Sequence, residues 1–403
     1  MQFSYTAKNK EGVVQSGSME AADRFALARA LRTQGLIPVS VKDTKQTGLS
    51  INIPFLEPKV TLREKILFTK NMSGMLRAGL SLVRALQVLN KQTTNKTFKK
   101  VLDSVEKDIV GGSTLSDSMK KFPKVFSELF VAMVSAGEES GDMSGALEQV
   151  GISIEKTYAL NARIKSALMY PMIILSAIFL IGILMFVFVV PTITKTFKDL
   201  GVDLPMSTKF VVWLSDTMSS HPLLLLLFLV IVGSGIAALL RSKSAQPKID
   251  TFILKLPVIS NLVRETNTAR TTRTISSLLG SGVDIVHTLT ITHEVLQNHL
   301  YKEVLNEAIE SVQKGGQLSV VFKKYPKLFP IMMSEMIAVG EETGKLSNML
   351  SDVAVFYEGE VDTKTKDLST IIEPVLMVFI GAAVGFFAIS MLSPMYSLMD
   401  TVK

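Results

Sequence analysis

Residues 137–141 read Gly-Glu-Glu-Ser-Gly, and residues 340–344 repeat this motif as Gly-Glu-Glu-Thr-Gly. The shift of 203 residues, from 137 to 340, holds without a gap through the surrounding sequence. Identical pairs at this shift include Leu76/Leu279, Gly79/Gly282, Gly112/Gly315, Pro123/Pro326 and Pro171/Pro374. A period this long far exceeds the roughly 20–45 residues of a solenoid unit, so it indicates a duplicated domain.

A long apolar segment follows each copy of the repeat, and another lies between the copies. Residues 172–190, 222–240 and 374–399 contain no charged side chain. Each segment, as a helix, is long enough to cross about 30 Å of hydrocarbon. We therefore predict three transmembrane helices, and a duplicated unit that consisted of a soluble domain and one membrane helix.

The basic residues near the apolar segments predict the orientation of the chain. Arg163 and Lys165 directly precede the first segment and Arg241 follows the second, whereas the three lysines of residues 192–221 are balanced by three aspartates. The cytoplasmic side of a membrane protein carries the excess of Lys and Arg. The amino terminus and both repeats are therefore expected in the cytoplasm, with residues 192–221 and the carboxyl terminus outside.

The excess of basic over acidic residues is also explained by the membrane orientation. The chain has 43 Lys and Arg against 36 Asp and Glu, which by itself could suggest binding to nucleic acid. The surplus lies mainly before the first apolar segment, as the membrane orientation requires, and no aromatic-basic stripe accompanies it. We expect no nucleic-acid partner.

The residue types argue against a catalytic or metal site. The absence of cysteine excludes disulfides, thiolate metal sites and cysteine nucleophiles. Three of the four histidines, at 287, 293 and 299, are spaced by six and share no helix face. Residues 340–346 are one residue short of a phosphate-binding loop and end in leucine where a hydroxyl is needed. We expect no metal, no cofactor, no catalytic residue and no enzymatic activity.

The fold is expected to be mainly α, with a small N-terminal α/β unit, two homologous antiparallel helical bundles in the cytoplasm and three transmembrane helices. Thr61 and Glu64 form a capping box that predicts the start of the first bundle. The last helix of each bundle has no strong stop before Pro171 or Pro374, which allows it to continue into the membrane. The expected boundaries are 1–45 for the α/β domain, 46–60 for a linker, 61–167 for the first repeat, 168–191 for the first transmembrane helix, 192–221 for an external loop, 222–240 for the second transmembrane helix, 241–270 for a linker, 271–372 for the second repeat, 373–399 for the third transmembrane helix and 400–403 for an external tail.

The paired glutamates of the repeated motif, Glu138, Glu139, Glu341 and Glu342, are expected in loops. In the structural interpretation, the glycines permit tight turns and a carboxylate caps the next helix. In the functional interpretation, an acidic loop docks a basic partner or a divalent cation. We favour the structural interpretation because capping is sufficient to explain the residues.

Two features of the third apolar segment are candidate contacts. Glu373 directly precedes Pro374 and is either an acid at a helix start or the partner of a cationic group on a membrane-embedded client. Gly381 and Gly385 form a GxxxG pattern that permits close helix packing in lipid. The pattern either joins two protomers or packs the spans of one chain together, and we favour the second in a multi-span protein.

Taken together, several stretches resemble the type II secretion F protein and type IV pilus platform family over essentially the whole chain. They are residues 3–21 (FSYTAKNKEGVVQSGSMEA), 35–41 (GLIPVSV), the pair 61–86 and 268–289, and the two GEE(S/T)G motifs. The resemblance implies a multi-pass platform protein of the bacterial cytoplasmic (inner) membrane that forms homo-oligomers. It also implies contacts with a hexameric assembly or retraction ATPase, with prepilin or pseudopilin subunits and with other inner-membrane alignment proteins.

The resemblance implies a mechanical function, in which motion of the ATPase shifts the platform and helps pilin-like subunits enter or leave the filament. The alternative is an oligomeric membrane transporter or channel component. Against that alternative, the apolar segments contain no Asp, Glu, Lys, Arg or His that would mark a transport pathway.

Overall fold

The computed structural model describes residues 2–8, 14–21, 23–33, 35–43, 58–199, 204–220, 222–242, 245–257 and 259–401. The chain divides into two compact units, Met1–Lys59 and Val60–Lys403. Most of the expected linker at 46–60 lies outside the described residues.

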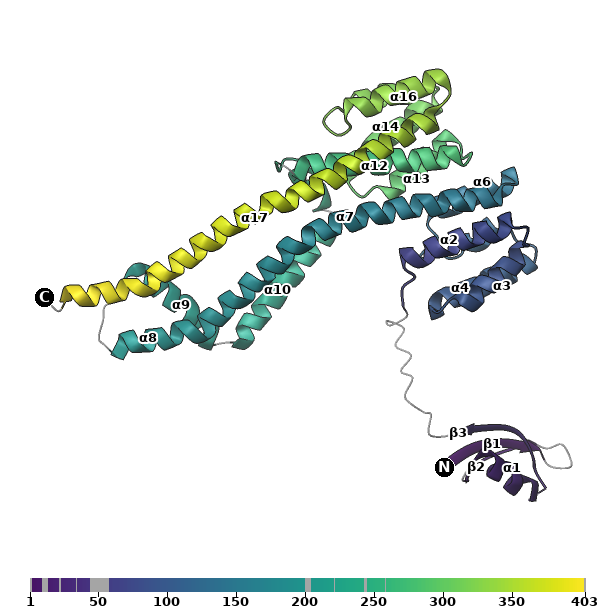
Figure 1. Cartoon of the computed structure of the whole chain (residues 1–403), viewed down its shortest axis with the longest axis horizontal. Helices are drawn as coiled ribbons and strands as arrows, with labels where there is room; N and C mark the ends of the chain where they lie inside the picture. The colour runs from purple at the N-terminus through teal and green to yellow at the C-terminus, as the bar shows by residue number, and fades with distance from the viewer. Residues whose placement is uncertain are drawn as a thin grey trace. The chain divides into compact units, whose positions relative to one another are not determined.

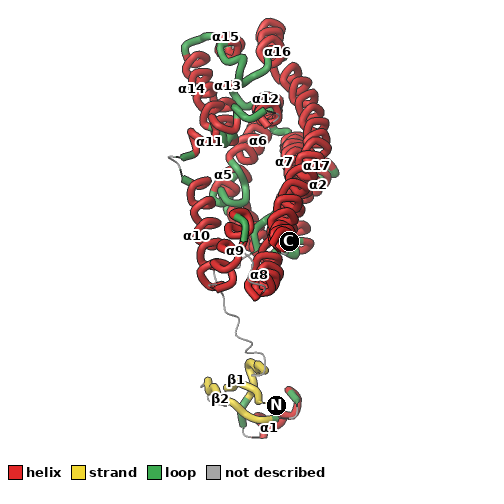
Figure 2. Tube along the Cα trace, turned by 90° about the vertical axis from the view of Figure 1, so that its left-hand side faces the viewer, coloured by secondary structure: helices red, strands yellow, loops and turns green. Residues whose placement is uncertain are grey.

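The first unit is a small α/β domain, as predicted. Its strands β1 (Gln2–Lys8), β2 (Val14–Glu20) and β3 (Ile37–Asp43) form an antiparallel sheet in the order β2-β1-β3. Figure 2 draws the strands in yellow. The helix α1 (Arg24–Thr33) packs on this sheet. Leu27 and Leu31, one turn apart on α1, are fully buried and form a small core.

The second unit contains the two repeats, and each is a bundle of six helices (Figure 1). A capping box at Thr61 and Glu64 starts the first bundle, as predicted. The first bundle comprises α2 (Leu62–Arg77), α3 (Leu82–Gln92), α4 (Lys96–Val110), α5 (Leu115–Lys120), α6 (Glu128–Ser140) and the start of α7 (Met143–Leu184). The second comprises α12 (Ile259–Gly280), α13 (Ile285–Val295), α14 (His299–Gln313), α15 (Leu318–Lys323), α16 (Ile331–Thr343) and the start of α17 (Leu346–Thr401).

The duplication is visible in the helix ends and in the cores. The helices α3 to α6 begin and end 203 residues before α13 to α16. The rings of Phe98 and Phe126, with centroids 6.4 Å apart, correspond to those of Tyr301 and Phe329, 5.0 Å apart. Since these four side chains are almost fully buried, the same aromatic contact anchors both bundles.

The last helix of each repeat does continue into its apolar segment. The helix α7 runs unbroken for 42 residues and α17 for 56 residues, with Pro171 and Pro374 inside them. A short π-helix, η2 (Met185–Val189), and α8 (Val190–Asp199) extend α7 further. Two helical stretches, Met143–Phe197 and Leu346–Pro394, are long and apolar enough to cross a membrane. The second expected span forms the 20-residue helix α10 (Pro222–Arg241).

Residues 192–221, the expected external loop, are mostly helical among the described residues, and their position outside the membrane stays a prediction. The helix α8 continues to Asp199, and α9 (Met206–Ser220) follows. Val211 and Val212 of α9 are buried in a cluster with Val190 and Met391. This apolar contact explains why a segment with balanced charges folds into a helix.

The expected linker at 241–270 is also largely helical among the described residues. It contains α11 (Gln246–Ile253) and the first part of α12, which begins at Ile259. The part of α12 inside the expected linker includes Thr266, Thr268 and Ala269, which are buried. At its N-terminal end, α12 also starts six residues before the position that corresponds to Leu62, the first residue of α2. The predicted external tail at 400–403 begins inside α17, which ends at Thr401.

Candidate functional site

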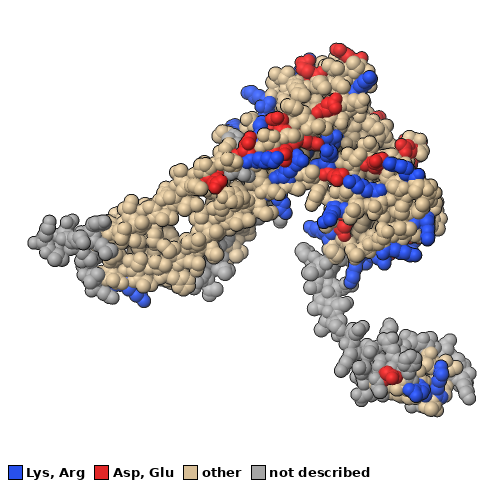
Figure 3. Space-filling view, viewed as in Figure 1, with Lys and Arg blue, Asp and Glu red and all other residues tan. Residues whose placement is uncertain are grey.

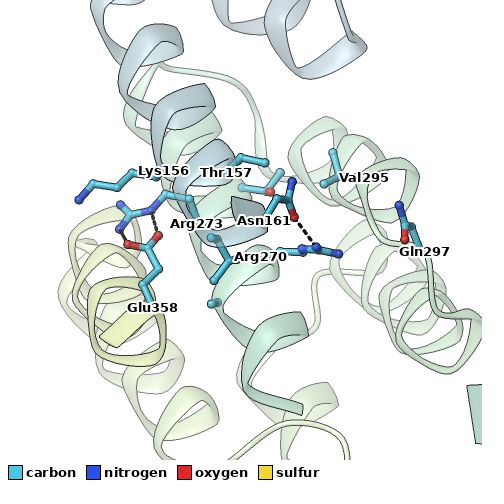
Figure 4. A pocket seen from close by; sticks show the side chains of 11 residues that line it. Lys156, Thr157, Asn161, Arg270, Arg273, Val295, Gln297 and Glu358 are labelled. Atoms are coloured by element: carbon cyan, nitrogen blue, oxygen red, sulfur yellow. Dashed lines mark hydrogen bonds and ion pairs between the residues drawn. The ribbon is translucent and has the colours of Figure 1, made fainter. Parts of the chain in front are cut away.

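The two repeats meet where α7 passes along α12 and α17 (Figure 1). A polar cavity of about 140 Å³ lies at this crossing, lined by residues of α7, α12 and α17 and by the end of α13 (Figure 4). Residues from sequence positions more than 100 apart thus share one site. We call this region the crossing.

A nearly buried ion pair occupies one side of the crossing. The guanidinium of Arg273 donates from Nε to Oε1 of Glu358 at 2.7 Å and from a terminal nitrogen to Oε2 at 3.0 Å (Figure 4). Only 11% and 13% of the two side chains are exposed. Bidentate geometry and burial make this pair stronger than a surface ion pair, because solvent screens it less.

Further polar contacts join α7 to the second repeat. A terminal nitrogen of Arg270 donates to Oδ1 of Asn161 at 2.6 Å, and burial lowers the pKa of the Arg270 guanidinium. Arg163 on α7 lies 3.3 Å from Asp362 on α17. These contacts fix the position of α7 against both α12 and α17.

A third ion pair, Lys364 with Glu265, joins α17 to α12. The crossing therefore has the features of a rigid joint between long helices. It brings together no nucleophile, base and orienting group of the kind that catalysis requires. Within the described ranges, no group of three or more His, Cys, Asp or Glu is arranged to hold a metal.

The predicted loops at the paired glutamates are wrong: both motifs lie in the last turns of helices. Glu138 and Glu139 are inside α6, which ends at Ser140 and is capped by Gly141, where φ is +78°. Glu341 and Glu342 are likewise inside α16. A positive φ favours glycine, which explains the final residue of the motif.

The first glycine of the motif has a different role. A Cβ built on Gly137 would overlap the Cβ of Ala146, and one built on Gly340 would lie 2.8 Å from Cα of Leu346. The glycine therefore permits α6 to approach α7, and α16 to approach α17. Glycine is typical both of a helix break and of a close approach between helices. The sequence pattern alone could not distinguish the two, and we predicted a break here.

The first glutamate of each motif caps a helix, although not the next one along the chain. Glu138 accepts the N–H of Leu115 at 2.5 Å and that of Ser116 at 3.0 Å, which are the first residues of α5. Glu341 accepts the two equivalent N–H groups of α15 at 2.5 and 3.2 Å. Each carboxylate thus satisfies donors that the helix leaves unpaired and compensates its positive end.

The second glutamate of each motif points to solvent. Glu139 and Glu342 are exposed, and Glu139 accepts a hydrogen bond only from Ser135 of its own helix, at 3.2 Å, among the described residues. The docking of a basic partner or cation through these two residues stays a prediction.

The candidate contacts of the third apolar segment lie along α17. Glu373 is exposed and is not at a helix start, because α17 continues through it. In the described part of the chain, a Cβ built on Gly381 or Gly385 would meet no atom within 4 Å. The GxxxG pattern therefore makes no close contact with another span of the described chain.

Sequence reasoning missed the crossing. Arg273 and Glu358 are 85 residues apart, and neither belongs to a recognisable motif. The repeat itself carried a signal, since the shift of 203 residues relates these two residues to Lys70 and Glu155, which also have opposite charges.

Comparison with known proteins identifies the family. The model of the type II secretion system protein F family matches residues 68–191 and 271–394, and that of its N-terminal domain matches residues 1–42. The chain is 36% identical over 404 residues to the type IV pilus assembly protein PilC of Thermus thermophilus, covering 100% of this chain and 99% of the relative. It is 30% identical over 405 residues to the type II secretion system protein F of Pseudomonas aeruginosa, covering 99% of both chains. The chain therefore belongs to the type II secretion system protein F family.

Proposed function

We propose that this protein is a non-enzymatic platform in the bacterial cytoplasmic (inner) membrane, part of a type IV pilus or type II secretion machine. It couples a cytoplasmic hexameric ATPase to the insertion or removal of prepilin-like subunits. The relatives are named as pilus assembly and secretion system proteins, which supports the assignment to one of these two machines. The proposed coupling between the ATPase and the pilin-like subunits is argued from the geometry of the long helices α7 and α17.

The observation that carries the proposal is the continuity of α7 and α17. Each forms part of a six-helix bundle and runs without a break into an apolar stretch. A continuous helix transmits a displacement of one end to the other, whereas a flexible linker does not. A force on either bundle would therefore move a membrane helix.

The distribution of charge supports the orientation in the membrane. Charged side chains cover both repeats, and the apolar stretch of the long helices shows almost none (Figure 3). We assign both repeats to the cytoplasm, α10 to the second span and the carboxyl terminus to the outside, following the excess of Lys and Arg. The ATPase then contacts the bundles, and the pilin-like subunits contact the spans.

A break in α7 between the bundle and the apolar stretch tests the coupling. Ser166, Leu168 and Met169 are exposed in this part of α7. Changing all three to glycine lowers the helix propensity by about 1 kcal/mol per residue relative to alanine. The matched control changes the same three residues to alanine.

We expect the glycine variant to insert in the membrane at the wild-type level but to lose surface pili or secreted substrate in a strain that lacks the native copy. The alanine variant should retain them. Wild-type activity of the glycine variant would show that a rigid connection through α7 is not required. Membrane insertion is measured by fractionation, so that a failure to insert is separated from a failure to couple.

A further inference from the structure

The two repeats of one chain contact each other through different faces. On the first repeat, α6 presents Leu129, Ala132, Met133 and Ala136, which we call the α6 stripe and which recur at helical spacing. On the second repeat, the contacting helices are α12 and α13.

These two helices and the turn between them present Leu278, Val283 and Ile291, which we call the α12–α13 face. All three are buried, and they belong to the hydrophobic core of the first repeat rather than to that of the second. The contact therefore joins unlike faces of two homologous domains, in a head-to-tail arrangement.

Because the domains are homologous, each one also has the face that its neighbour uses. The second repeat carries a counterpart of the α6 stripe, formed by Met332, Glu335, Met336 and Val339, which we call the α16 stripe. Ala132 and Met133 are buried, whereas their equivalents Glu335 and Met336 are exposed and partly buried. Leu129 and Ala136 are partly buried, whereas their equivalents Met332 and Val339 are 40% and 44% exposed. Figure 1 shows α16 at the outer edge of the second repeat, away from α6.

The first repeat carries a counterpart of the α12–α13 face. It consists of Met75, Leu80 and Val88, which we call the α2–α3 face. Val283 is 9% exposed, and its equivalent Leu80 is 37% exposed. Met75 and Val88 are half-buried. The first repeat therefore leaves open an apolar surface that is covered in the second.

The ion pair of the crossing is likewise covered in the second repeat, whereas its equivalent in the first repeat is exposed. Arg273 and Glu358 are nearly buried beside α7, whereas their equivalents, Lys70 and Glu155, form a 2.8 Å ion pair in which each side chain is 50% exposed. The open surface of the first repeat thus extends from the α2–α3 face to the place that corresponds to the crossing.

We propose that a second copy of this chain covers these surfaces, so that the α16 stripe of one copy packs on the α2–α3 face of the next. The charges beside the two surfaces are complementary. Glu342 is exposed on α16, where Glu335 already pairs with Lys323 at 3.0 Å, and Arg84 and Lys91 are exposed on α3. Like-charge contact of two α16 stripes, or of two α2–α3 faces, would be repulsive.

The contact is heterologous, since it joins two different surfaces: in any one contact each copy uses one of its two surfaces and leaves the other free for a further copy. Such contacts build rings when the rotation between copies closes. The inference deepens the proposed platform function and rests on it for one point, that neighbouring copies have the same orientation in one bilayer. The interface extends the contact seen inside the chain to the contact between chains.

Cysteine cross-linking tests the contact, because the natural chain has no cysteine. Two full-length copies with different tags are expressed together in membranes, one with Leu80→Cys and the other with Val339→Cys. A second pairing uses Val88→Cys with Met332→Cys. A disulfide requires Cα atoms within about 7 Å, so only faces in contact react efficiently.

We expect cross-linked dimers that carry both tags in at least one pairing, with a yield at least fivefold above a control. The control pairs Val339→Cys with Lys99→Cys, an exposed position on α4. Adding Met332→Asp to the copy with Val339→Cys should lower the yield at least threefold. Val110→Asp, at a position that is exposed at the end of α4, should leave the yield unchanged.

Two results would overturn the proposal. One is a yield in both pairings that is no higher than the control. The other is efficient cross-linking of Val339→Cys to itself, which would indicate a symmetric contact of two α16 stripes. Pilus assembly or secretion is measured in the same cells, so that loss of the contact with retained activity counts against this interface and not against the platform function.

Discussion

Arg273 and Glu358 form a bidentate ion pair beside α7, at the point where the two repeats of the chain meet. The equivalent pair in the first repeat, Lys70 and Glu155, lies open to solvent. The same position in a duplicated domain thus has two environments. The difference arises because α7 lies against the second repeat in this chain, whereas no segment of the described chain covers the first repeat in the same way.

Because one ion pair is nearly buried and the other is open to solvent, removing them should lower the free energy of unfolding by different amounts. Glu358→Gln leaves Arg273 nearly buried without a counter-ion, and breaking a buried pair costs about 3 kcal/mol or more. Glu155→Gln is the matched control, for which we expect less than about 1 kcal/mol because surface pairs contribute little. Thermal unfolding of the full chain in detergent measures both. Equal shifts in Tm would contradict the structural difference between the pairs.

A second prediction separates the two glutamates of each repeated motif. Glu138→Ala removes the acceptor of the first two N–H groups of α5 and should cost about 1–2 kcal/mol, the range for the loss of an N-terminal cap, while Thr114 still accepts the N–H of Asp117. Glu139→Ala, at the adjacent exposed position, should change the unfolding free energy by less than about 0.5 kcal/mol. The measurement is the midpoint of denaturant unfolding. If Glu139→Ala were instead the more destabilising change, the assignment of the cap would be wrong.

The shift of 203 residues predicted two homologous helical bundles. This was possible because Gly and Pro mark the ends of helices locally, and the duplication allowed each copy to check the other. The capping box at Thr61 and the continuation of α7 past Pro171 were also readable from the sequence. These features depend on residues within a few turns of one another.

The features that sequence reasoning got wrong depend on distant contacts. Gly137 resembled a break because the sequence does not show that Ala146 lies against it. The helix α9 was missed because its apolar residues Val211 and Val212 pack on Val190 and Met391, which belong to other helices. The crossing was missed for the same reason, since it forms only when α7 lies beside the second repeat.

A third prediction tests the close approach of α6 to α7. Gly137→Ala places a methyl group against Ala146 and should destabilise the first repeat by about 1–3 kcal/mol, as overpacking does. Gly74→Ala is the control: Gly74 is exposed inside α2, and a Cβ there meets no described atom within 4 Å. It should stabilise the chain by up to about 1 kcal/mol, because alanine favours the helix. Opposite signs of the two Tm shifts are expected, and a neutral Gly137→Ala would argue against the close approach.

A fourth prediction concerns acid sensitivity of the second repeat. Glu307 accepts hydrogen bonds from Lys324 at 2.6 Å and from the hydroxyl of Tyr325 at 2.5 Å, and these two bonds hold the pKa of the carboxyl below its ordinary value of 4.5. A folded pKa below the unfolded one contributes stability that is present above pH 4.5 and is lost as the pH falls toward the folded pKa. The contribution is at most about 1 kcal/mol, because Lys324 is half exposed and solvent screens the pair.

Glu307→Gln removes this contribution, so the variant should be less stable than the wild type at pH 7 and the difference should shrink as the pH falls below 4.5. Glu310→Gln, at an exposed position on the same helix, is the control and should follow the wild-type pH dependence. Unfolding midpoints are measured for all three chains from pH 7 to the acid limit of solubility. A constant offset between Glu307→Gln and the wild type over this range would show that the carboxylate is not stabilised by its two donors, because only a group with a shifted pKa makes stability depend on pH.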